Sequence, residues 1–93
     1  MKYLIERRLK RTSSQLNSAK EDLRVTVEHI AHFAEIEDDT RLRSIVSDSP
    51  LEAHEYAEAR GDLAGLVRRR DELLAEIARL ERLQDELLDQ WNG

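Results

Sequence analysis

The sequence predicts an all-α fold: a long antiparallel coiled-coil helical hairpin with a short helix or loop at an acidic tip. Three observations predict it. Leucine recurs every seven residues in the first and last thirds of the chain, a proline with a helix-start signature lies between them, and the composition is 38% charged but only 4% aromatic. We expect a single domain over residues 1–93, with a first arm at about 2–37, the tip at about 38–49 and a second arm at about 50–91.

The first arm carries a heptad repeat. Its apolar positions alternate in steps of four and three residues, which places them on one face of a helix. The a positions hold Leu9, Leu16, Leu23 and Ile30, and the d positions hold Ile5, Thr12, Ala19, Thr26 and Phe33. This face is the predicted seam of the hairpin.

The middle of the chain is acidic and has no sustained periodicity. Residues 35–62 carry nine acidic and three basic side chains, whereas residues 1–34 carry four acidic and seven basic ones. We expect a short helix at 41–46, with Leu42, Ile45 and Val46 on one apolar edge. Ser49, Pro50 and Glu52 then form a predicted capping box, so the second arm should begin near Pro50.

The second arm repeats the heptad with leucine at d. The d positions hold Leu66, Leu73, Leu80 and Leu87, and the a positions hold Leu63, Arg70, Ile77, Gln84 and Trp91. A parallel homodimer would bring Arg70 against its own copy in the core, which is unfavourable. In an antiparallel hairpin, pairing residue n with residue 96 − n matches apolar with apolar positions, and places Thr12 opposite Gln84 and Thr26 opposite Arg70.

Two glycines lie on the outer face of the second arm. Gly61 and Gly65 each cost about 1 kcal/mol relative to alanine in a helix interior. We expect the short helix of the tip to pack closely over them and over the nearby alanines; a hinge is the alternative.

The residue types present argue against metal binding, catalysis, nucleic-acid binding and membrane insertion. There is no cysteine, and His29 and His32 have the spacing of metal ligands but no third ligand at matching spacing. We therefore expect no metal, no cofactor and no catalytic residues. The acidic balance and the lack of aromatic residues among the basic clusters argue against direct nucleic-acid binding. No apolar run is long enough for a membrane span or a signal peptide, and we expect a cytoplasmic protein.

Two surfaces are predicted to bind a partner. The acidic tip offers Asp38, Asp39, Asp48, Glu52 and Glu55, and an apolar flank at e positions offers Val27, Val67, Leu74 and Leu88. A broadened apolar stripe usually packs against a further helix. Self-association into a four-helix bundle, as a homodimer, or docking onto a larger partner would cover it. We expect a non-enzymatic protein–protein interaction module, an adaptor or regulator of a larger cytoplasmic assembly.

The tip also resembles a known family. The stretch from Asp48 to Arg60 is similar to the tip of the Gre transcript-cleavage factors, whose helical hairpins enter the secondary channel of bacterial RNA polymerase. Five positions match, Glu52, Glu55, Tyr56, Ala59 and Arg60, although one extra residue separates Asp48 from Glu52. The resemblance implies a polymerase regulator in which Asp48 and Glu52 hold Mg²⁺ within the complex. This is the alternative to the adaptor reading.

Overall fold

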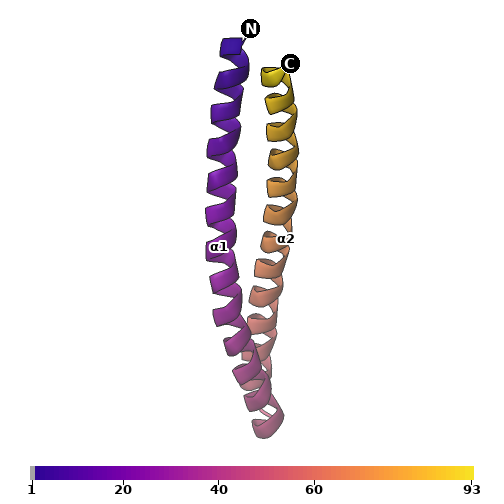
Figure 1. Ribbon diagram of the computed structural model, residues 1–93. Helices are drawn as coiled ribbons and strands as arrows, with labels where there is room; N and C mark the ends of the chain where they lie inside the picture. The colour runs from indigo at the N-terminus through magenta and orange to yellow at the C-terminus, as the bar shows by residue number, and fades with distance from the viewer. Residues whose placement is uncertain (1) are drawn as a thin grey trace. The chain divides into compact units, whose positions relative to one another are not determined.

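The computed structural model describes residues 2–93, and these form two helices joined by a turn (Figure 1). Helix α1 spans Lys2–Ser47 and helix α2 spans Pro50–Asn92, with no strand in the described residues. The predicted all-α helical hairpin is confirmed. The hairpin divides into two parts, one built from residues 2–24 and 71–93 and the other from residues 25–70, and each is described by itself below.

The part built from residues 2–24 and 71–93 holds the main apolar core. One cluster joins members of three successive predicted layers: Leu16, Ala19, Leu73, Ile77 and Leu80, with Leu23 packed against them. Leu80 is only 1% exposed. Burying an aliphatic side chain of this size contributes roughly 1.5–3 kcal/mol, so these layers supply much of the stability of this part. The cluster is consistent with the predicted register.

A polar layer next to this core differs in detail from the expected pairing of Thr12 with Gln84. Gln84 Nε2 instead donates to Ser13 Oγ across the helices, at 3.1 Å. Thr12 is buried, and its hydroxyl donates to the Arg8 carbonyl of its own helix at 2.8 Å. A threonine that bonds the preceding turn needs no partner across the seam, which leaves Gln84 for the neighbouring serine.

In the part built from residues 25–70, the seam continues up to the turn. The heptad places Glu37, Thr40 and Ser44 in the seam of α1, and all three are at least half-buried. Thr40 is 4% exposed, and Ala59 on α2, which the register places opposite Glu37, is 5% exposed. The seam therefore extends three layers beyond Phe33, where the aliphatic repeat of the first arm ends.

Helix α1 therefore continues ten residues past its expected end near residue 37, and the expected separate helix at 41–46 forms its last turns. Two ion pairs support this extension: Asp38 with Arg41 at 2.6 Å and Asp39 with Arg43 at 2.8 Å. Ion pairs three and four residues apart favour the helical conformation. Thr40 adds hydroxyl bonds to the carbonyls of Ile36 and Glu37.

The connection between the helices is the two residues Asp48 and Ser49. Asp48 adopts a left-handed backbone conformation with φ of 51°, the usual way to end an α-helix. Ser49 precedes Pro50, and its carbonyl accepts the first hydrogen bond of α2 from the Ala53 amide at 3.0 Å. The predicted start of α2 at Pro50 is confirmed.

The expected covering of Gly61 and Gly65 is wrong. A Cβ added at Gly61 would meet no atom within 4 Å, and one at Gly65 would meet only the Arg68 side chain at 3.7 Å. Because residues 41–46 continue α1, no short helix folds back over these glycines. They border an open groove with His29, Phe33, Asp62 and Leu66.

Candidate interaction surfaces

The turn end of residues 25–70 exposes four large apolar side chains. We call Leu42, Ile45, Val46 and Leu51 the turn patch; their exposed fractions are 50%, 67%, 85% and 64%. Leu42, Ile45 and Val46 share one face of α1 because they are spaced by three and four residues. The heptad places that face away from the seam, so the packing of α1 against α2 cannot cover it.

A groove lies within the turn patch. It is lined by Leu42, Arg43, Val46, Ser47 and Glu52, and has a volume of about 240 Å³. Glu52 Oε2 is buried and has no hydrogen-bond partner, so the predicted capping bond does not satisfy it. The groove thus combines apolar side chains with a half-buried carboxylate.

The five predicted tip carboxylates have different surroundings. Asp38 and Asp39 lie within α1 and pair with Arg41 and Arg43. The hydrogen bond to Asp38, and then its charge, raise the pKa of Arg41 above its ordinary value. Asp48 is exposed in the turn, whereas Glu52 and Glu55 are half-buried on α2. Asp48 and Glu52 are therefore the carboxylates that lie at the turn itself.

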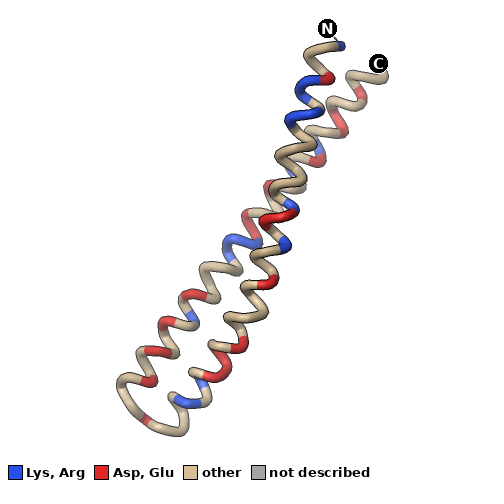
Figure 2. The backbone as a smooth tube through the Cα atoms, turned by 90° about the vertical axis from the view of Figure 1, so that its left-hand side faces the viewer, with Lys and Arg blue, Asp and Glu red and all other residues tan. Residues whose placement is uncertain are grey.

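Most acidic side chains of residues 25–70 lie on the segments that flank the turn. Figure 2 shows acidic positions on both helices where they approach it, with a short basic stretch near the end of α1. That basic stretch contains Arg41 and Arg43, whose charges are offset by Asp38 and Asp39. Glu58 on α2 lies 3.1 Å from His54. The turn end is thus an apolar patch with an acidic surround.

The predicted flank residues fall in both parts of the hairpin. Within residues 25–70, Val27 is 48% exposed and Val67 is half-buried. In the other part, Leu74 and Leu88 are 48% and 41% exposed. All four were expected to face outward beside the seam, and three are exposed.

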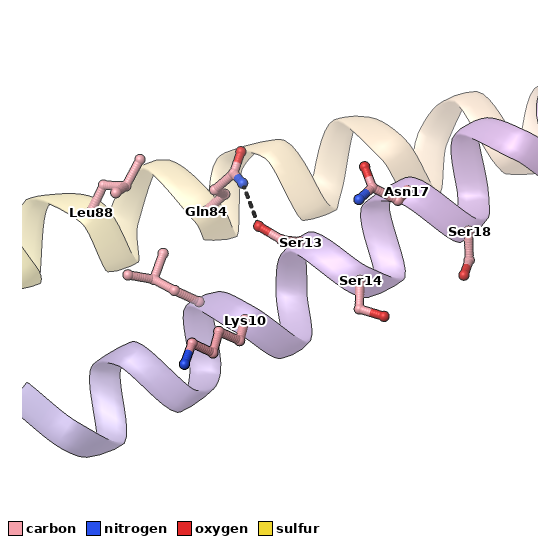
Figure 3. A pocket seen from close by; sticks show the side chains of 8 residues that line it. Lys10, Ser13, Ser14, Asn17, Ser18, Gln84 and Leu88 are labelled. Carbon is pink, nitrogen blue, oxygen red and sulfur yellow. Dashed lines mark hydrogen bonds between the residues drawn. The ribbon is translucent and has the colours of Figure 1, made fainter.

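A third groove, lined in part by Leu88, was not predicted from the sequence (Figure 3). It is open, about 600 Å³ in volume, and half of its lining residues are small polar side chains of α1: Ser13, Ser14, Asn17 and Ser18. Gln84, which donates to Ser13, lines it from α2. The run of small polar residues was the available signal, but serines on a helix surface are common and do not by themselves predict a groove.

The histidine pair has no metal-site geometry. His32 packs edge-on against Phe33 with ring centroids 5.6 Å apart, and His29 lines the groove near the glycines. Within residues 2–93, no group of three or more His, Cys, Asp or Glu side chains is placed to hold a metal ion. Neither α1 nor α2 contains a segment apolar enough, over sufficient length, to cross a membrane.

Comparison of the chain with protein-family models, with curated proteins and with solved structures finds no match.

Proposed function

We propose that this chain is a non-enzymatic protein–protein interaction module, an adaptor or regulator of a larger cytoplasmic assembly, that binds through its turn end. The observation that carries the proposal is the turn patch: four large apolar side chains lie exposed within ten residues. Exposed apolar clusters rimmed by polar groups commonly mark protein-binding sites. The seam holds both helices on the opposite side and leaves these side chains available.

The acidic surround supports a partner with a basic surface. Residues 35–62 carry nine acidic and three basic side chains. Complementary charge around an apolar contact speeds association and excludes wrong partners, and its effect weakens as salt rises. The apolar patch would then supply most of the affinity and the acidic rim most of the selectivity.

The proposal is tested by affinity capture with three baits, each followed by identification of the bound proteins. The first bait is the unmodified chain, the second carries Leu42→Gln and Val46→Ser, and the third carries Leu74→Gln as a control in the other part of the hairpin. We expect the same partner on the first and third baits and its loss from the second. Equal capture by the first two baits would contradict a role for the turn patch.

A second candidate is a regulator that enters the secondary channel of RNA polymerase, as the resemblance to the Gre factors implies. The observation that favours it is the placement of Asp48 in a two-residue turn between two long helices, with Glu52 in the first turn of α2. A metal held by these two carboxylates would need further ligands from the polymerase. Recovery of polymerase subunits on the unmodified bait, and their loss after Asp48→Asn, would favour this candidate over the adaptor.

A further inference from the structure

We propose that the groove of the turn patch binds one cationic side chain, Arg or Lys, that projects from an apolar surface of a partner protein. The inference rests on the proposed function and deepens it, because it names the chemistry by which the partner is recognised. It is carried by the juxtaposition of Glu52 with Leu42 and Val46 in one groove.

The size of the groove fits a side chain. At about 240 Å³ it lies below the roughly 300–1,000 Å³ typical of small-molecule sites. Leu42 and Val46 are among its lining residues, and their apolar side chains would contact the methylene stem of Arg or Lys. Both side chains bury their stems along apolar surface while the charged group reaches a polar partner.

The charge in the groove selects a cation. Glu52 lines the groove, and its Oε2 has no donor within the described chain. The negative charge of a carboxylate is shared by its two oxygens, so a cationic donor that reaches either one stabilises the whole group. Hydrogen bonds to charged groups are worth about 1.5–3 kcal/mol, more than neutral ones.

The two helix ends at the turn contribute little to this field. The last carbonyls of α1 carry a partial negative charge with no basic residue in the last turn, and the first amides of α2 carry a partial positive charge two residues further along the chain. Asp48 directly follows α1 and is exposed. Arg43, the one basic residue that lines the groove, is paired with Asp39 at 2.8 Å. The electrostatic environment therefore favours a positive group from outside.

The experiment uses the full chain and a defined probe. The probe is a short amidated helical peptide with one central Arg flanked by leucines on the same face; its control replaces that Arg by citrulline, which has nearly the same shape and no charge. Binding is followed by amide chemical shifts of the chain. We expect the Arg peptide to shift the amide resonances of residues 42–52. The citrulline peptide should bind at least about tenfold more weakly than the Arg peptide.

Chain variants identify the recognising group. Glu52→Gln should weaken the Arg peptide by about tenfold and leave the citrulline peptide unchanged. Glu58→Gln is the matched control, since it removes the same charge from an exposed position on α2, and should have little effect. The melting temperature of Glu52→Gln should change little, because the loss of a favourable charge in the first turn of α2 is offset by removal of a carboxylate whose Oε2 has no donor.

Three results would overturn the inference. The first is equal binding of the Arg and citrulline peptides, or no binding of either at the turn. The second is an unchanged affinity after Glu52→Gln. The third is a dimer of the unmodified chain that dissociates after Leu42→Gln and Val46→Ser, since a second copy would then occupy the groove. Loss of partner capture by that double variant, with no effect of Glu52→Gln, would leave the proposed function standing and reject only the cation.

Discussion

Ala59 and Asp48 show how single residues control the turn end. Ala59 is 5% exposed in the seam, whereas Ala57, two residues earlier on α2, is exposed. Asp48 has a φ of 51°, which costs an ordinary L-residue roughly 1–2 kcal/mol in regular structure and is most easily adopted by glycine. One residue is thus constrained by packing and the other by backbone conformation.

Replacing Ala59 by Glu should lower the free energy of unfolding by about 2–4 kcal/mol, because a carboxylate would enter a close-packed layer without a partner. Ala57→Glu makes the same change on the exposed face and should alter stability by less than about 0.5 kcal/mol. Urea denaturation of both variants is the measurement. Similar values for the two would show that the seam does not reach this part of α2.

Replacing Asp48 by Gly should raise the free energy of unfolding by about 0.5–1 kcal/mol, since glycine adopts the left-handed conformation without a Cβ clash. Asp48→Ala, which keeps a Cβ and removes the carboxylate, should give no gain. Thermal melts of both variants separate backbone strain from charge. A loss of stability in both would instead mean that the Asp48 carboxylate stabilises the turn.

At the scale of the helices, the register of the seam is set where leucine faces leucine. Leu23 and Leu73 belong to one apolar cluster in the part built from residues 2–24 and 71–93. Their layer lies between those of Ala19 and Thr26 in the heptad, so it is a sensitive probe of both register and direction.

Paired cysteines at Leu23 and Leu73 should form a disulfide within one chain under mild oxidation, because residues of one seam layer have Cβ atoms near enough to be bridged. Cysteines at Leu23 and Leu80 lie two layers apart and serve as the control, with little crosslink expected. Mobility under reducing and non-reducing conditions reads out both. Crosslinks found only between chains would rule out the hairpin pairing.

The helices were predictable because aliphatic side chains mark their seams. Leucines every seven residues predict both helices, and Ser49 with Pro50 predicts the start of α2. The end of α1 was missed because its last seam positions hold Glu37, Thr40 and Ser44, whose polarity hides the heptad. Their burial depends on the facing helix, and local ion pairs maintain the helix there. The burial of these polar residues is a tertiary effect that leaves no apolar repeat in the sequence, whereas the spacing of the ion pairs was a local signal that could have indicated the longer helix.

At the scale of the whole molecule, the exposed apolar side chains of the single chain are the candidates for burial by a partner protein. The sequence predicts the apolar edge formed by Leu42, Ile45 and Val46, but not its exposure. From the sequence we expect this edge to pack over Gly61 and Gly65 within the chain. Because α1 is continuous to Ser47, that packing does not occur. The same residues are therefore available to a partner.

The exposure of the apolar flank leads to a separate prediction about the oligomeric state. Leu74 and Leu88 lie outside the seam and are partly exposed. If two hairpins associate through them, changing both to Glu should lower the mass seen by light scattering to that of a monomer and leave the helix content unchanged. A monomer already present in the unmodified chain would refute self-association through the flank and direct attention to the turn end.

Hydrogen exchange of the chain, alone and with its captured partner, tests the central claim most directly, because it locates the contact without any substitution. Amides at the ends of helices exchange readily unless they are covered. The account predicts that binding slows exchange at the last turn of α1, the turn and the first turn of α2, within residues 42–54, and leaves residues 74–91 unchanged. Slowed exchange confined to residues 74–91, with none at the turn, would contradict it.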